Sequence, residues 1–115
     1  MIDWHTRSFD ELTPRELHAI LALRSRVFVV EQRSAFLDPD EHDRNARHLW
    51  GAERGEIVAY LRALPPGEKY AEASVGRIVV DASQRKTGLG KDLVRCLIAL
   101  CDSLARAVMR ISAQA

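Results

Sequence analysis

A short polar segment with two glycines stands between a hydrophobic strand candidate and a helix candidate that carries a leucine stripe. Its residues are Arg85, Lys86, Thr87, Gly88, Leu89 and Gly90, followed by Lys91. A glycine-containing turn that opens a helix leaves backbone N–H groups without intrahelical partners. Those N–H groups and the positive end of the helix dipole favour phosphate. The segment therefore predicts either a phosphate or diphosphate site, or an ordinary strand-to-helix turn whose glycines serve packing.

Two common phosphate motifs do not fit this segment. A Walker A loop that ends at Gly90 and Lys91 would need glycine at position 85 and Ser or Thr at position 92. Those positions hold Arg85 and Asp92. A dinucleotide-binding fingerprint that starts at Gly88 would need a third glycine at position 93, which is a leucine. Any phosphate group here would be held by a different loop.

The carboxylates, imidazoles and thiols of the chain do not form a metal-binding pattern. A calcium loop counted from Asp38 would have Asp43 at its glycine position and Leu49 at its glutamate position. Cys96 and Cys101 lie about 140° apart around a helix, so they cannot bind one metal ion from one face. The acidic run 38–43 either attracts a cationic amine or forms a solvated loop. His48 either reaches a cleft or has a structural role.

The elements that must position these residues follow the order β-α-(short helix or loop)-β-β-β-α-β. Thr13, Pro14 and Glu16 form a capping-box pattern that starts the first helix, which runs to about Val30. The strand 72–81, the helix 88–105 and the strand from 108 to 115 form a β-α-β unit, so its two strands should be parallel. The remaining strands are expected at 2–7, on a sheet edge, and at 47–53 and 56–64, as a hairpin.

Composition limits the possible functions. The 115 residues fit one domain, residues 1–115, and 47% of them are hydrophobic. The 17 basic and 16 acidic residues give a net charge of +1, which leaves no electrostatic case for nucleic-acid or membrane binding. No apolar run approaches the ~20 residues of a membrane span. Two cysteines do not make a disulfide framework, which favours a reducing cytoplasm.

Several short motifs, in order along the chain, resemble the GNAT N-acetyltransferases and in particular their ElaA-like branch. Arg85-x-x-Gly88-x-Gly90, after a strand that ends in Val80, resembles the acetyl-CoA pyrophosphate loop of that family. The other motifs are Phe9-x-Glu11-Leu12-Thr13, Leu21-Ala22-Leu23-Arg24, residues 27–32, His48-Leu49, Ala59-Tyr60-Leu61-Arg62 and Gly76-Arg77-Ile78-Val79-Val80.

The resemblance implies an α/β (α+β) GNAT acyl-CoA N-acyltransferase fold. Its sheet would be mixed and mostly antiparallel, with flanking helices. The domain would lack the family's last helix and strands. It implies transfer of an acetyl group from acetyl-CoA to a primary amine. By position, Ile78, Val79 and Val80 would line the thioester and pantetheine, and residues 85–90 would bind the pyrophosphate through backbone N–H groups. Lys86 or Lys91 would either reach the 3′-phosphate or remain solvated.

An acetyl transfer to an amine usually needs a base. An alkylammonium has a pKa near ~10.4, so about one molecule in 10³ is nucleophilic at pH 7. Glu72 stands 13 residues before Arg85, and in this spacing it resembles the base of the histone-acetylating GNAT group. The alternative is that Glu72 is an exposed residue at the end of a strand. Glu31 is the second candidate, although pairing with Arg24 or Arg26 is an alternative use. Tyr60 and Tyr70 do not occupy the position of the family's acid.

The chain also departs from the family pattern. Lys86 stands where many members have glycine, and Ala82 stands where many have proline. A shortened domain would be either active or a catalytically silent domain that binds CoA or a protein partner. In both cases the strand 108–115 would expose an edge, which favours pairing with a second copy into a homodimer.

Overall fold

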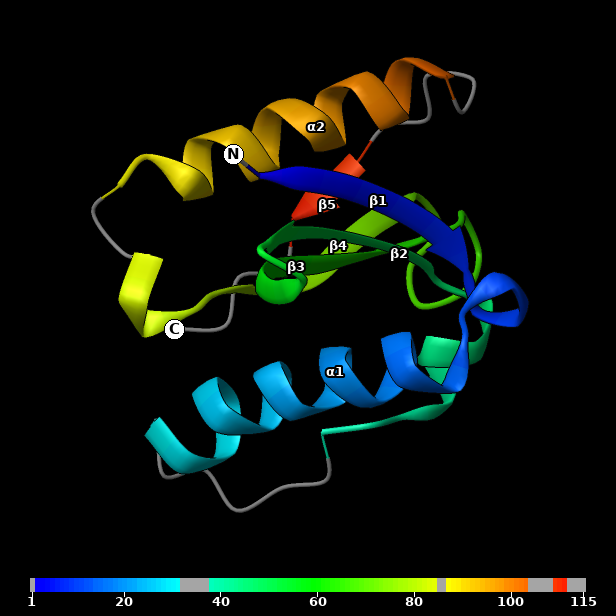
Figure 1. Ribbon diagram of the computed structural model, residues 1–115. Helices are drawn as coiled ribbons and strands as arrows, with labels where there is room; N and C mark the ends of the chain where they lie inside the picture. Colours follow the sequence, from blue (N-terminus) through cyan, green and yellow to red (C-terminus); the bar gives the residue numbers. More distant parts are fainter. Residues whose placement is uncertain (1, 32–37, 85–86, 104–108, 112–115) are drawn as a thin grey trace.

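A single sheet forms the middle layer of the protein (Figure 1). The computed structural model describes residues 2–31, 38–84, 87–103 and 109–111. Within them the sheet has five strands in the order β1-β2-β3-β4-β5. Their bounds are β1 Asp3–Ser8, β2 Arg47–Glu53, β3 Glu56–Leu64, β4 Ala73–Val80 and β5 Met109–Ile111. β1 is an edge strand, as predicted.

All pairings between neighbouring strands are antiparallel except the last one. β4 and β5 are parallel, which confirms the predicted β-α-β unit. β4 lies between β3 and β5, so it is a central strand of the sheet. Of the predicted last strand, residues 108 and 112–115 lie outside the described part of the chain, so pairing of this edge with a second copy stays a prediction.

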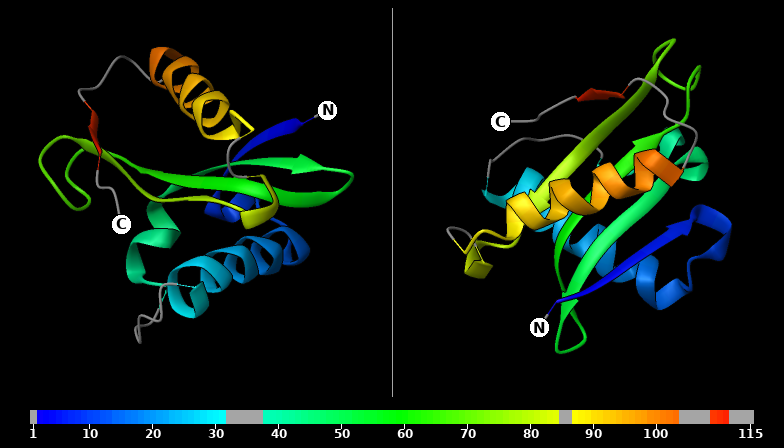
Figure 2. Two further views of the ribbon diagram at one scale, coloured as in Figure 1. Left: turned by 90° about the vertical axis from the view of Figure 1, so that its left-hand side faces the viewer. Right: turned by 90° about the horizontal axis from the view of Figure 1, so that it is seen from above.

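Two long helices cover opposite faces of the sheet (Figures 1 and 2). They are α1, Pro14–Arg24, and α2, Leu89–Ser103. α1 continues as a π-helix, η2, Ser25–Glu31, so the predicted extent to about Val30 is correct but the type of helix changes. Three of the seven η2 residues are valines, whose branching lowers α-helix propensity. Short 3-10 helices are η1 Phe9–Glu11, η3 Glu41–Asn45 and η4 Ala82–Gln84.

The start of α1 confirms the predicted capping box. Glu16 N donates to Thr13 Oγ1 at 3.1 Å, and Thr13 N donates to Glu16 Oε1 at 2.9 Å. We expect Thr13→Ala to lower the free energy of unfolding by about 1 kcal/mol, because the helix loses an N-cap acceptor. Thr13→Ser keeps the hydroxyl and should retain most of that stability. Urea unfolding of the three proteins checks this, and an unchanged midpoint in Thr13→Ala would disprove it.

Each face of the sheet has its own hydrophobic cluster. The cluster under α2 contains Leu49, Val58, Ala59, Leu61, Val75, Leu89 and Leu93. The cluster under α1 contains Ile20, Leu23, Val27, Phe28, Trp50, Tyr60 and Val79. Leu89 and Leu93 begin the predicted leucine stripe, and both are buried. The two clusters fix β4 between the helices.

A bulge interrupts β4 where it passes Leu61. Tyr60 pairs with Val79 and Arg62 pairs with Gly76, so residues 77 and 78 together lie opposite one residue of β3. Arg77 has a φ of 51°, which is unusual for a residue other than glycine. The bulge places Gly76 and Arg77 on the α1 side of the sheet. Within the described residues, β5 pairs with β4 at Ala73, Ser74 and Val75.

Candidate active site

The chain turns sharply between the end of β4 and the start of α2. Lys91 N and Asp92 N both donate to Gly88 O, at 3.1 and 3.2 Å. These are the first backbone bonds of α2, so the N–H groups of Gly88, Leu89 and Gly90 precede the helix's own hydrogen bonds. They lie at the positive end of the helix dipole, which suits an anion. Arg85 and Lys86, which belong to the predicted loop, lie outside the described residues.

The two glycines at this turn differ in backbone conformation and in the space around them. Gly88 has a φ of +86°, a conformation that other residues rarely adopt. Gly90 is exposed, and a Cβ there would meet nothing closer than Val80 Cγ2 at 4.0 Å. A Cβ at Gly88 would meet no heavy atom within 4 Å. Since no described neighbour fills this space, packing does not explain the glycines, and the first turn of α2 offers bare backbone to a ligand.

Side-chain contacts hold the segment before this turn. Asp81 Oδ2 accepts hydrogen bonds from Ser83 N at 3.2 Å and from Ser83 Oγ at 2.5 Å. Arg26 Nη2 lies 3.2 Å from Asp81 Oδ1, which ties the segment to η2. The hydrogen bonds from Ser83 lower the pKa of Asp81 and so keep it ionised. Gln84 Nε2 donates to Glu53 Oε1 at 2.9 Å, which fixes the segment to the end of β2.

The three residues expected along the pantetheine occupy both faces of β4. Val79 is buried in the cluster under α1, whereas Ile78 and Val80 are half-buried against the cluster under α2. All three come after Val75 in β4, where the described pairing with β5 stops at Ile111. Their placement on β4, between the bulge and the glycine turn, stays a prediction for ligand contact.

The two candidate bases are not brought together by the structure. Glu72 directly precedes β4 and is half-buried. It stands four residues before Gly76, roughly 13 Å along an extended strand. The role of Glu72 as a base therefore stays a prediction. Glu31 ends η2, and its side chain lies outside what the structure describes.

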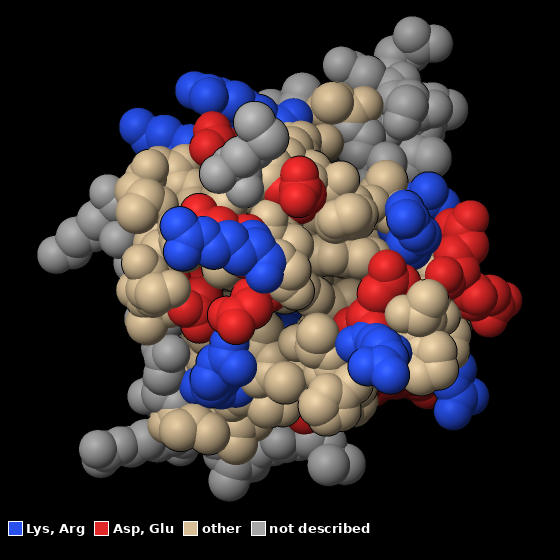
Figure 3. Space-filling model, viewed as in Figure 1, with Lys and Arg blue, Asp and Glu red and all other residues tan. Residues whose placement is uncertain are grey.

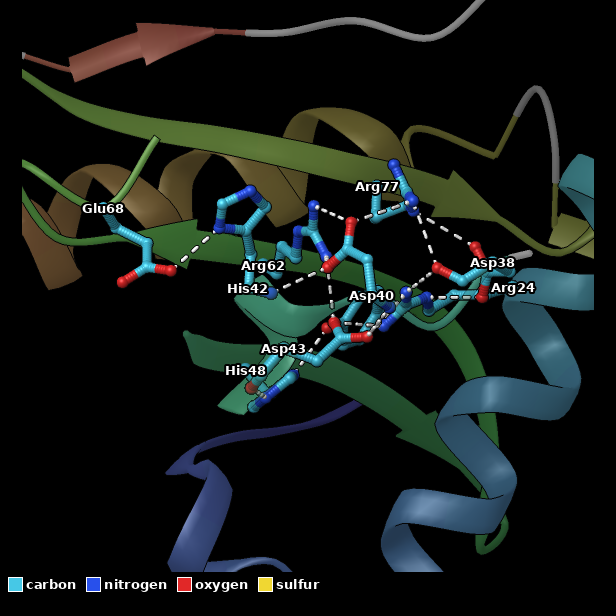
Figure 4. Close-up of polar contacts among 10 residues, drawn as sticks. Arg24, Asp38, Asp40, His42, Asp43, His48, Arg62, Glu68 and Arg77 are labelled. Atoms are coloured by element: carbon cyan, nitrogen blue, oxygen red, sulfur yellow. Dashed lines mark hydrogen bonds and ion pairs between the residues drawn. The ribbon is translucent and has the colours of Figure 1, made fainter. Parts of the chain in front are cut away.

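The acidic run 38–43 is not the solvated loop that was one expectation from the sequence. Figure 4 shows its aspartates turned toward three arginines from α1, β3 and β4. Asp38 and Asp43 are 2% and 6% exposed. The buried ion cluster consists of Arg24, Asp38, Asp40, Asp43, Arg62 and Arg77. The sequence did not show this, because the arginines that neutralise the run come from distant segments.

Arg24 and Asp43 form the centre of the ion cluster. Arg24 Nη1 lies 2.8 Å from Asp43 Oδ1, and Arg24 Nε lies 2.8 Å from Asp38 Oδ2. Arg24 is therefore a buried arginine paired with carboxylates. Burial alone would raise the pKa of Asp43, but hydrogen bonds and charge from Arg24 outweigh it and leave this pKa lowered. Asp43 is therefore a structural anion. Among the described residues, the carboxylate paired with Arg26 is Asp81.

His48 also has a structural role. Its Nε2 lies 3.0 Å from Asp43 O, and its Nδ1 lies 2.6 Å from Tyr60 Oη. A carbonyl oxygen only accepts, so Nε2 carries the proton and Nδ1 accepts from the tyrosine hydroxyl. His48 is fully buried, and burial lowers its pKa. The imidazole is therefore neutral and both of its nitrogens are hydrogen-bonded, so it does not serve as a base.

The buried neutral imidazole predicts a pH dependence of stability. Since the folded state holds the pKa of His48 below its unfolded value of about 6.5, the unfolded chain binds more protons below that pH. We expect the free energy of unfolding to fall as pH drops from about 6.5 toward 5. Chemical unfolding at several pH values checks this, and His48→Gln should flatten the slope. His18→Gln removes an exposed imidazole and is the control, so its slope should match that of the wild type. A slope in His48→Gln equal to the wild-type slope would refute the prediction.

A small pocket opens on the α1 side of the sheet, beside the bulge. Its enclosed volume is about 10 Å³, which is room for about one water molecule. The lining residues are Arg62, Leu64, Lys69, Ser74, Val75, Gly76 and Arg77. Sequence reasoning did not select Arg62, Lys69 or Ser74 as site residues. The sequence offers one sign that Arg62 is a buried cation, because it stands among hydrophobic residues in a strand, as in Tyr60-Leu61-Arg62.

The described part of the chain lacks two other features. It contains no group of three or more His, Cys, Asp or Glu side chains placed to hold a metal ion. None of its helices has the length and apolar character needed to cross a bilayer. On the face seen in Figure 3, basic and acidic side chains lie next to one another rather than in a patch of one sign.

Comparison with known proteins decides the family. Residues 3–114 match the acetyltransferase (GNAT) family. The chain belongs to the GNAT family. A Pseudomonas aeruginosa acyl-CoA N-acyltransferase has a similar structure, with a TM-score of 0.93 and 33% identity over 99% of this chain and 80% of that one. Escherichia coli ElaA gives a TM-score of 0.87 and 32% identity, over 92% of this chain and 73% of its own. The GNAT fold is thereby confirmed.

Curated relatives of this GNAT protein carry names without a specific activity. A UPF0039 protein of Synechocystis is 35% identical over 99% of this chain and 75% of its own length. A UPF0039 protein of Schizosaccharomyces pombe is 41% identical over 75% of this chain and 57% of its own length. The chain thus spans between about half and three quarters of these relatives. Family and fold support acyl transfer, and they leave the acceptor open.

Proposed function

We propose that this GNAT protein is an N-acetyltransferase that moves an acetyl group from acetyl-CoA to a primary amine. The observation that carries the proposal is the turn at Gly88 and Gly90, between the central strand β4 and α2, where no described side chain covers the backbone that opens the helix. An anionic diphosphate suits those N–H groups and the dipole behind them. The thioester of acetyl-CoA supplies the activated acetyl group.

The residues of this chain fit the parts of acetyl-CoA in order. Residues 85–90 bind the diphosphate, chiefly through backbone N–H groups, and Lys86 or Lys91 reaches the 3′-phosphate. Ile78, Val79 and Val80 line the pantetheine along β4. These three residues lie between the bulge and the glycine turn, which supports that order. The ligand would thus run along β4.

The reaction needs a free amine at the thioester. The amine nitrogen forms a bond to the acetyl carbon, the carbon–sulfur bond breaks, and the sulfur leaves as the CoA thiolate. A base takes the ammonium proton first, and Glu72 is our first candidate, with Glu31 second. Glu72 is half-buried beside the start of β4 and acts on the amine directly or through water. After the bond forms, the nitrogen loses a second proton, which passes through water to the CoA thiolate, since the described residues offer no assigned acid.

Release of free CoA tests this proposal. Purified protein with acetyl-CoA and a panel of primary amines should release thiol, and calorimetry should detect acetyl-CoA binding. Glu72→Gln should lower turnover without weakening that binding, whereas Gly88→Trp should abolish both. Binding without turnover on any amine would point to a silent CoA-binding domain instead. Absence of both binding and turnover would remove the proposal.

A further inference from the structure

Asp38 contacts two arginines from different elements at once (Figure 4). It is 2% exposed. Its Oδ1 accepts a hydrogen bond from Arg77 Nε at 3.1 Å, and its backbone O accepts one from Arg77 Nη2 at 3.1 Å. Its Oδ2 lies 2.8 Å from Arg24 Nε, and the same backbone O accepts from Arg24 Nη2 at 2.9 Å. Asp38 therefore ties the end of α1 to the bulge of β4.

The bulge decides which face of the sheet each later side chain of β4 occupies. Side chains of a regular strand alternate between the two faces. Val75 lies in the cluster under α2, so without a bulge residues 77 and 79 would lie on that face too. Instead Val79 lies in the cluster under α1, whereas Ile78 and Val80 pack against the cluster under α2. The one extra residue has thus exchanged the faces of the three residues proposed to line the pantetheine.

The ion pair of Arg77 favours this bulged register. Arg77 is 7% exposed and donates two hydrogen bonds to Asp38 and one, at 3.3 Å, to Asp40. A regular register would turn its guanidinium toward the apolar cluster under α2, where a buried charge without a partner is strongly disfavoured. The same contacts explain how a residue other than glycine keeps a φ of 51°, because such a conformation persists where its surroundings over-determine it.

Resting on the proposed binding of acetyl-CoA along β4, we infer that Asp38 is a positioning residue for acetyl transfer. Through Arg77 it holds the bulge, and the bulge holds residues 78–80 in the register that meets the pantetheine. The glycine turn has other supports, among them the hydrogen bond from Gln84 to Glu53. Loss of Asp38 therefore affects the pantetheine end of the ligand and spares the diphosphate end.

Two ligands separate these two ends. Acetyl-CoA and 3′-phospho-ADP share the nucleotide and the diphosphate, and only acetyl-CoA carries the pantetheine and the acetyl group. Asp38→Asn should weaken acetyl-CoA binding at least tenfold and change 3′-phospho-ADP binding by less than twofold. Arg77→Gly should give the same split, because glycine adopts a positive φ readily but lacks the side chain that holds the bulge. Calorimetry at a temperature where thermal unfolding shows each protein to be folded provides the affinities.

Asp43→Asn is the matched control. It removes a buried carboxylate from the same ion cluster, one that bonds to Arg24 and Arg62 rather than to Arg77. Asp43→Asn should therefore leave both affinities within twofold of the wild type in spite of its lower stability. A residue that only stabilises the fold would not distinguish acetyl-CoA from 3′-phospho-ADP.

Cross-strand NOEs report on the register without any ligand. Labelled wild-type protein should show contacts between Tyr60 and Val79 and between Arg62 and Gly76, which pair on either side of the bulge. Asp38→Asn should lose at least one of these two contacts, and Asp43→Asn should keep both.

The outcomes distinguish this inference from the proposed function. Unchanged acetyl-CoA binding in Asp38→Asn, an equal loss for both ligands, or unchanged cross-strand NOEs would overturn the inference alone. If Asp38→Asn does not fold, Arg77→Gly decides by the same criteria. A wild-type protein that binds neither ligand would remove the transferase proposal and this inference together.

Discussion

Gly90→Glu is expected to weaken acetyl-CoA binding about 100-fold without unfolding the protein. A carboxylate about 5 Å from a diphosphate charge costs about 3 kcal/mol at an effective dielectric constant near 20. The folded state tolerates the change, because a Cβ at Gly90 meets only Val80 at 4.0 Å. An acidic residue in the first turn of α2 also suits the helix dipole. Calorimetric titration with acetyl-CoA and thermal unfolding measure the two effects separately.

A matched pair of glycines controls for backbone strain at this site. Gly88 and Gly67 have the same φ of +86°, and a Cβ at either would meet no atom within 4 Å. Replacing either by alanine should therefore cost similar stability, about 1–2 kcal/mol. Only Gly88→Ala should also weaken acetyl-CoA binding. Equal affinities in both alanine variants, together with tight binding by Gly90→Glu, would show that the diphosphate lies elsewhere.

Asp43→Asn is expected to lower the free energy of unfolding by about 3–5 kcal/mol. Asp43 accepts hydrogen bonds from Arg24 Nη1 at 2.8 Å and from Arg62 Nη1 at 3.0 Å. It also accepts one from Asp40 N at 3.1 Å. An asparagine removes the charge that neutralises two buried guanidinium groups. The loss is large compared with the 5–15 kcal/mol that stabilises a typical domain. Urea unfolding at pH 7 provides the measurement.

The pH dependence gives a second test of the same ion cluster. Since the folded state lowers the pKa of Asp43, its contribution is present above an unfolded pKa of about 3.9 and disappears as pH falls through the folded pKa. The difference between wild type and Asp43→Asn should therefore shrink below about pH 4. Asp92→Asn breaks an exposed pair with Arg95 and should cost less than 1 kcal/mol. Similar losses in both variants would disprove a special role for the buried cluster.

Local patterns in the sequence were enough to predict most of the fold. The capping box at Thr13, the turn at Arg54 and Gly55, and the leucine stripe from Leu89 act over a few residues. The structure places β2 and β3 at the predicted positions and begins α2 within one residue of the expected start. The change to a π-helix at Ser25 was not predicted, because the hydrophobic pattern and the capping box indicate a helix without indicating its hydrogen-bond spacing.

The site was predictable only where its residues are adjacent in sequence. The glycine turn at Gly88 and Gly90 is such a case. The bulge at Arg77 is not, because it depends on register with β3 and on contacts from Arg77 to Asp38 and Asp40. The acidic run similarly joins Arg24, Arg62 and Arg77 across more than 50 residues of chain. Long-range partners of this kind cannot be read from spacing.

A crystal structure of the full chain with bound CoA tests the central claim most directly. We expect diphosphate oxygens within hydrogen-bond distance of backbone N–H groups among residues 87–91, with the pantetheine running beside β4 toward the bulge. A diphosphate bound on another surface, with the first turn of α2 closed by side chains of the protein itself, would contradict this binding mode.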